Sequence, residues 1–184
     1  MKIEKIHHVA YRCNDAKETV EWYVDNLKMD FVLAIAENQV PSTKEPDPYM
    51  HVFLDAGNEN VLAFFELPTK PEMGRDENTP AWVQHIAFKV KDRKTLLDYR
   101  DHLEANGVKV LGVIDHAIFH SIYFFDPNGH RLELACPDED EELKLKRLDE
   151  VKWAMLEEWS ETKRAPKHAA WMHEKALDIS DKPK

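Results

Sequence analysis

Hydrophobic and polar positions follow the same order twice along the chain. Residues 8–15, His-Val-Ala-Tyr-Arg-Cys-Asn-Asp, align position by position with residues 85–92, His-Ile-Ala-Phe-Lys-Val-Lys-Asp. In both segments apolar β-branched and aromatic residues alternate with others, a pattern that indicates a half-buried strand. Because similarity at a fixed offset is typical of repeated structural units, we predict that the chain contains two units built on one plan.

A helix is predicted directly after the opening strand of each unit. In the first unit Asp15 is placed to cap the helix and Glu18 follows three residues later, which resembles a capping box. In the second unit Asp92 is the expected cap and Gly107 the expected end. The apolar stripe of the first helix consists of Ala16, Val20, Tyr23 and Leu27.

At least two further strands complete each unit. They are expected at residues 49–55 and 61–67 in the first unit, and at residues 118–125 and 130–136 in the second. The last two are separated by Asp126-Pro-Asn-Gly129, which is strong turn chemistry. Each unit therefore reads as strand, helix and at least two more strands.

The connections and the C-terminal region have a different character. Prolines indicate a loop at residues 37–48 and a linker between the units at residues 68–80. After an acidic start at residues 138–142, a long amphipathic helix is expected to reach about residue 163. Its apolar stripe could cover its own domain or a second copy of the chain. Residues 165–184 are weakly patterned and are expected to be weakly ordered.

Length and charge narrow the possible functions. A chain of 184 residues suits one compact domain, and 35 acidic against 25 basic residues give a net charge of −10. The negative charge therefore predicts that the protein binds neither nucleic acid nor an anionic membrane surface. No apolar run approaches the ~18 residues of a membrane span, and the start lacks a signal-peptide core, so we expect a cytoplasmic protein. Cys13 and Cys136 are too few for a disulfide framework.

Histidines and glutamates at repeated positions are the candidate chemistry. His7 and His8 should point to opposite faces of a strand, and the repeat selects His8 because its counterpart is His85. The closing strands supply a second pair, Glu66 and Glu133, each within an otherwise apolar run. A carboxylate in such a run is costly unless it is paired or bound to a cation. Together these side chains predict a divalent metal site with nitrogen and oxygen ligands.

The same residues resemble the vicinal oxygen chelate superfamily, which includes glyoxalase I, extradiol dioxygenases, methylmalonyl-coenzyme A epimerase, and fosfomycin- and bleomycin-resistance proteins. The resemblance implies an α+β fold in which two βαβββ modules form a curved mixed sheet around a metal cleft. The modules are expected at about residues 3–68 and 81–137, within one metal-binding domain at 1–137. A C-terminal helix at 138–164 and the tail at 165–184 lie outside the resemblance.

The second unit resembles the type I extradiol dioxygenase signature, from Ile114-Asp-His116 through Tyr123 and the Asp-Pro-Asn-Gly turn to Glu133. This resemblance implies that Fe(II), a catechol-like small molecule and dioxygen meet in the cleft. Tyr123 would orient the substrate, and His116 would act as acid and base. His120 and His51 are the reserve candidates for that role, and the implied metal ligands are His8, His85 and Glu133.

Glu66 leaves alternative predictions open. As a fourth ligand it would resemble the set of bacterial glyoxalase I and favour a lyase, isomerase or epimerase that works through a metal-bound enediolate, with Mn(II), Ni(II) or Zn(II) as further candidates. If Glu66 faces away from the cleft, the dioxygenase prediction stands. A metal-free binding protein of the bleomycin-resistance type is a second alternative. The chain is also a possible homodimer.

Overall fold

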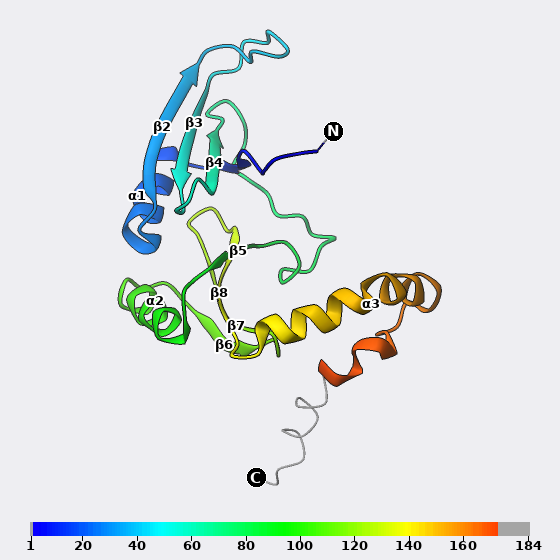
Figure 1. The fold of residues 1–184 in the computed structure, drawn as a ribbon. Coiled ribbons are helices and arrows are strands. Elements are labelled where there is room, and N and C mark those ends of the chain that lie inside the picture. Colours follow the sequence, from blue (N-terminus) through cyan, green and yellow to red (C-terminus); the bar gives the residue numbers. More distant parts are fainter. Residues whose placement is uncertain (1, 173–184) are drawn as a thin grey trace.

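The computed structural model describes residues 2–172, apart from the side chains of residues 168, 169 and 172 (Figure 1). The expected tail at 165–184 therefore lies largely outside the described residues. The elements in chain order are β1 (Val9–Cys13), α1 (Ala16–Leu27), β2 (Asp30–Glu37), β3 (Tyr49–Asp55), β4 (Val61–Glu66), β5 (Ile86–Lys89), α2 (Arg93–Ala105), β6 (Leu111–Asp115), β7 (Phe119–Phe125), β8 (Arg131–Pro137), α3 (Glu141–Thr162) and the 3₁₀ helix η1 (Lys167–Met172).

Within residues 2–172, eight strands form two four-stranded sheets with the same topology. The strand orders are β1-β4-β3-β2 and β5-β8-β7-β6, so each sheet contains one βαβββ module. In each module the first strand runs parallel to the last, and the other pairs are antiparallel. The predicted α+β class and the tandem modules are thus confirmed, with the strands divided between two sheets.

The helix starts follow the predicted chemistry. The Asp15 side chain accepts a hydrogen bond of 2.8 Å from the backbone N–H of Glu18, and Asp92 accepts one of 2.8 Å from Thr95. Gly107 follows α2 with a φ of +79°, a backbone conformation that glycine adopts without strain. Both N-caps hold an otherwise unpaired N–H of the first helical turn.

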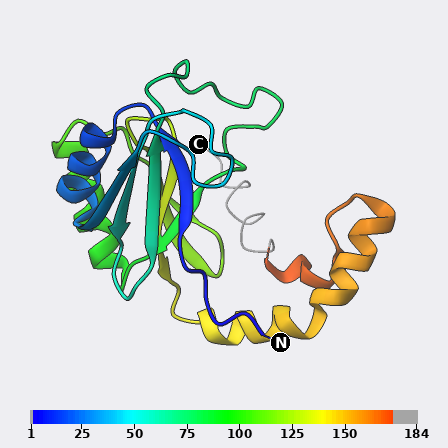
Figure 2. The same ribbon diagram turned by 90° about the horizontal axis from the view of Figure 1, so that it is seen from above.

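One core joins the two modules. α1 and α2 lie next to each other on the same side of the sheets (Figures 1 and 2), and most of the buried hydrophobic side chains form a single cluster. Polar contacts also cross between modules: the Tyr23 hydroxyl donates to Asp126 over 3.1 Å, and the Tyr99 hydroxyl donates to the Leu27 carbonyl over 3.4 Å. We call the side of each sheet away from α1 and α2 its open face.

α3 leaves the domain instead of covering it. It extends on the side of the sheets opposite α1 and α2 (Figure 2), none of its residues is buried, and its main tertiary contact is η1. The Arg147 guanidinium lies 4.0 Å from the Trp171 ring centroid and links the two helices. The apolar stripe predicted for this helix consists of Leu148, Val151, Met155 and Trp159. The first three are half-buried, whereas Trp159 is exposed. No helix among the described residues is long and apolar enough to cross a membrane.

Candidate metal centre

His85 and Glu133 form the centre of the candidate site on the open face of the second sheet. Glu133 lies on β8 opposite Ala87 of β5, and its side chain is only 3% exposed. His85 comes just before β5, which brings its Nε2 to 2.9 Å from Glu133 Oε2. The structure therefore joins two of the three ligands that the family resemblance implies.

The second ring nitrogen of His85 supports a metal-binding role. Nδ1 lies 3.0 Å from the Val83 carbonyl oxygen, so Nδ1 carries a proton and donates it. Nε2 then faces a carboxylate oxygen, and two acceptors at this distance need a proton or a cation between them. A backbone carbonyl on Nδ1 is the usual arrangement behind a metal-ligating Nε2. His85 and Glu133 thus suit two of the ligand positions of a divalent cation.

Ser121 supports the other oxygen of the carboxylate. It lies on β7 opposite Ala135, is fully buried, and donates its hydroxyl to Glu133 Oε1. A carboxylate this deeply buried needs such partners. Ser121 was not predicted from the sequence, although its position two residues before Tyr123 places it on the same face of the strand.

Tyr123 and His116 form a second pair beside the first. The Tyr123 hydroxyl lies 2.9 Å from His116 Nε2, and the Tyr123 and His85 rings meet edge to face at 5.8 Å. Burial, followed by the interaction with Glu133, raises the pKa of Tyr123 to about 12. Tyr123 therefore keeps its proton at neutral pH and can donate it to Nε2. Tyr123 thus lies next to both His116 and Glu133.

His8 lies on the open face of the first sheet instead. Its Nδ1 is 2.8 Å from His7 Nδ1, and its ring meets Phe53 at 5.5 Å and His51 at 6.1 Å. Within residues 2–172 no three His, Cys, Asp or Glu side chains gather into a group that could hold a metal ion. A single chain thus presents His85 with Glu133 in one place and His8 in another.

Glu66 is not the structural counterpart of Glu133, so the expected matched pair is wrong. Glu133 pairs with Ala87, and the equivalent residue opposite Ala10 is Ala63. Glu66 lies three residues further on, opposite the core residue Cys13, and its Oε2 accepts a 2.7 Å hydrogen bond from the N–H of Ala16. The two motifs look alike in sequence, but a shift of three residues moves the carboxylate to the helix-covered face.

The reserve histidines lie away from the His85–Glu133 pair. His51 is 8% exposed and stacks on Phe65 at 3.6 Å on the open face of the first sheet. Burial, together with nearby His8, lowers the pKa of His51. His120 alternates with Ser121 and Tyr123 on β7 and pairs with the core residue Cys136, so it faces the opposite side of the sheet.

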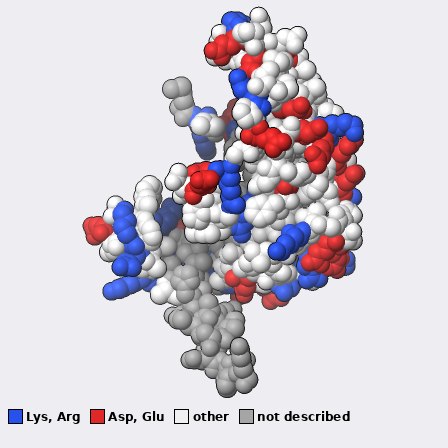
Figure 3. Space-filling view, turned by 180° about the vertical axis from the view of Figure 1, so that it is seen from behind, with Lys and Arg blue, Asp and Glu red and all other residues white. Residues whose placement is uncertain are grey.

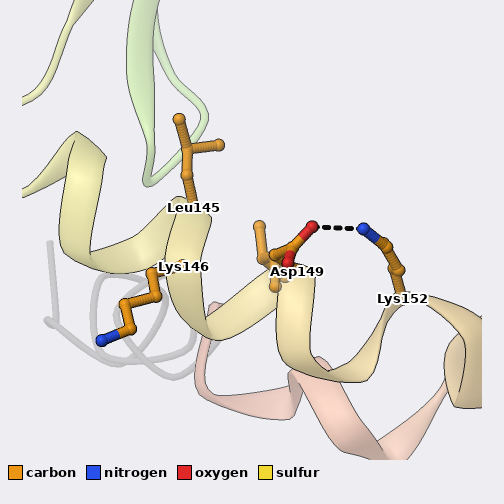
Figure 4. A pocket seen from close by; sticks show the side chains of 5 residues that line it. Leu145, Lys146, Asp149 and Lys152 are labelled. Carbon is orange, nitrogen blue, oxygen red and sulfur yellow. Dashed lines mark hydrogen bonds and ion pairs between the residues drawn. The ribbon is translucent and has the colours of Figure 1, made fainter.

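The described residues contain two hollows, one beside the His85–Glu133 pair and one on α3. A cleft of about 330 Å³ lies beside the His85–Glu133 pair, and its lining also includes Phe119 and Pro137. A second hollow lies on α3 (Figure 4), where Lys152 pairs with Asp149 and no histidine is present. Acidic and basic side chains are intermingled on the described part of the face in Figure 3. The cleft beside His85 is therefore the candidate substrate site.

One known protein family matches most of the chain. The model of the Glyoxalase/Bleomycin resistance protein/Dioxygenase superfamily matches residues 5–134. This match covers more than half of the chain, so the chain belongs to that superfamily. The resemblance predicted over residues 3–137 is thereby confirmed at the level of the superfamily.

Individual relatives are distant. A Bacillus subtilis (strain 168) protein named "Putative ring-cleaving dioxygenase MhqA" is 26% identical over 84 residues, which is 46% of this chain and 27% of that protein. A glyoxylase/bleomycin resistance protein/dioxygenase domain from Frankia sp. EAN1pec is 17% identical with a TM-score of 0.59, covering 75% of this chain and 95% of that one. Fosfomycin resistance protein FosX from Mesorhizobium loti is 20% identical with a TM-score of 0.55, covering 77% and 98%. The two solved structures show the fold alone.

Proposed function

We propose that the protein is a metal-dependent ring-cleaving dioxygenase acting on a catechol-like diol. The observation that carries this proposal is the 2.9 Å contact between Tyr123 and His116 directly beside the His85–Glu133 pair. A similarity to a named ring-cleaving protein supports it. The isomerase alternative needs Glu66 as a fourth ligand, and the carboxylate of Glu66 is engaged at the start of α1 instead.

His85 Nε2 and Glu133 Oε2 are the proposed metal ligands within this chain. Fe(II) is the proposed ion, because nitrogen and carboxylate ligands with open positions suit it. When bound, the ion would supply Lewis acidity to the two diol oxygens. Ser121 would hold the carboxylate in one orientation, and the Val83 carbonyl would hold the imidazole, so the ligands are ordered before binding.

His8 is proposed to reach a shared centre from a second copy of the chain. In one chain His8 contacts His7 and Phe53 and not the His85–Glu133 pair. The edge strand β2 also exposes apolar side chains that a second copy would cover: Phe31, Val32, Leu33 and Ile35 are 42–54% exposed. A homodimer would then contain two sites, each built from both chains.

Co-expression of two inactive variants tests this shared site. Random pairing of His8→Ala with Glu133→Ala chains gives one intact site in each mixed dimer, and about a quarter of wild-type activity is expected. Pairing His85→Ala with Glu133→Ala is the matched control, because both residues lie in the same module, and it should restore nothing. If the first pair also restores nothing, His8 does not act across the interface.

The proton-handling residues follow from the hydrogen bonds. Tyr123 is protonated at neutral pH and donates its O–H toward His116 Nε2 or toward a substrate oxygen that replaces it. His116 Nε2 is then free to accept the diol proton and later return it. Because His116 lies on the β6–β7 loop and is partly exposed, it can exchange that proton with solvent.

Oxygen uptake decides between the candidate activities. Protein purified anaerobically with Fe(II) is incubated with a panel of catechols in an oxygen electrode, and oxygen consumption with yellow ring-fission product is expected. Tyr123→Phe and His116→Gln should each lower kcat by about a hundredfold or more. Turnover of a hemithioacetal without oxygen consumption would contradict the proposal and support the isomerase alternative.

A further inference from the structure

Arg131 is a charged residue on the open face of the second sheet, next to Tyr123, and the proposed mechanism does not use it. It lies on β8 two residues before Glu133 and therefore points to the same open face. Its guanidinium carbon lies 4.1 Å from the centroid of the Tyr123 ring. This distance is typical of a cation–π contact between the guanidinium and the ring.

The charge of Arg131 is uncompensated within the described chain. The other charged groups of this face are paired: Glu133 with His85, and Lys89 with Glu141 over 3.3 Å. For Arg131, no carboxylate or carbonyl among residues 2–172 lies within hydrogen-bonding or ion-pair distance, although the side chain is partly buried. The Arg131 nitrogens are not among the buried unpartnered polar atoms of the described chain, so its N–H donors are accessible to an acceptor from solution.

We propose that Arg131 binds an oxyanion group carried by the substrate, so that the substrate is an aromatic acid or phosphonate and not a neutral molecule. This proposal rests on the proposed function in so far as it treats this face as the substrate site. A guanidinium presents two parallel N–H donors that match the two oxygens of such a group. Tyr123 would hold the fork in place, and the same ring would stand next to the diol. Arg131 thus acts in positioning and specificity.

Calorimetric titration of full-length protein tests the proposal without turnover. The protein is kept metal-free with a chelator and titrated with benzoate, phenylphosphonate and the neutral isostere benzamide. Wild-type protein should bind at least one anion more tightly than benzamide, and the tighter anion distinguishes a carboxylate from a phosphonate. Arg131→Gln should weaken anion binding by at least about thirtyfold and leave benzamide binding unchanged.

Two further variants control for fold and for simple charge. Arg131→Lys keeps the charge but loses the fork, so it should give an intermediate affinity. Arg100→Gln removes a guanidinium on α2 that pairs with Asp101, and it should bind all three probes like wild type. Equal binding of anions and benzamide by wild type, no anion binding, or unchanged anion affinity in Arg131→Gln would each overturn the role of Arg131. Because no oxygen or metal is involved, these outcomes are independent of whether the protein is a dioxygenase.

Discussion

The two modules share a scaffold but differ in the chemistry of their open faces. In the first module Ala63 lies opposite Ala10, and the face consists of aromatic rings around His51. In the second module the position of Ala63 is taken by Glu133, which pairs with His85. Strand order, helix caps and core positions are repeated. The duplicated fold therefore preserves what packing requires, while the histidine–carboxylate pair occurs in only one of the two described modules.

Glu66 and Cys136 show a second difference between the modules, on the helix-covered face of the sheets. The two residues occupy equivalent places: Glu66 lies opposite Cys13 in the first sheet, and Cys136 directly follows Ala135, the last residue of the β5–β8 pairing. Glu66 uses its carboxylate to hold the N–H of Ala16, whereas burial raises the pKa of the Cys136 thiol and keeps it neutral. The same position thus supports a helix start in one module and core packing in the other.

The largest expected effect is a loss of activity on substitution of Glu133 that is not seen on substitution of Glu66. Glu133→Gln removes the carboxylate that faces His85, and kcat/KM should fall by more than about a hundredfold, above the range for residues that only support a ligand. Iron content per chain, measured by atomic absorption, should fall in parallel. The matched control is Glu66→Gln, which should retain both. Equal losses in the two variants would show that Glu66 also takes part in the site.

Substitutions in the core test whether the modules fold as one unit. Leu62 of the first module and Leu132 of the second occupy equivalent positions and are 3% and 0% exposed. Replacement of either by alanine should reduce the free energy of unfolding by about 2–5 kcal/mol. Because they share one core, denaturation followed by circular dichroism should show a single transition in both variants. Two separate transitions would indicate that the modules unfold independently.

Removal of the carboxylate at the start of α1 should have a moderate effect. Glu66→Ala leaves the N–H of Ala16 without its acceptor, and we expect a loss of about 1 kcal/mol in unfolding free energy. Cys136→Ala in the second module removes no such helix contact, so any destabilisation there would come from lost packing. The two variants are compared by urea denaturation. A stability of Glu66→Ala equal to wild type would show that water replaces the carboxylate.

The smallest effect concerns acid stability of the first module. Burial lowers the pKa of folded His51 below its ordinary value of 6.5, so the unfolded chain takes up a proton first as the pH falls. The stabilisation is present above pH 6.5 and is lost as the pH falls toward the folded pKa. His51→Phe should therefore show a smaller drop in Tm between about pH 7.5 and about pH 5.5 than wild type. An identical drop in both proteins would contradict this assignment.

The sequence repeat predicted the helices and strands more accurately than it predicted the geometry of the candidate site. Alternation and caps located the helices and most strands, because these depend on residues close in the chain. Ser121 and Arg131 were missed although the same alternation places them beside Tyr123 and Glu133. The matching of Glu66 with Glu133 was wrong because similar flanking letters do not determine strand register.

The sequence by itself determined the duplicated order of strand, helix and at least two more strands, the helix starts, and the set of histidines and carboxylates available for chemistry. Periodicity and capping are local properties, so they can be read from neighbouring residues. Only the tertiary structure decided that His85 meets Glu133, that Glu66 turns to the helix-covered face, and that His8 lies in a separate cluster. These outcomes depend on strand register and on the packing of two modules, which bring together residues far apart in the chain.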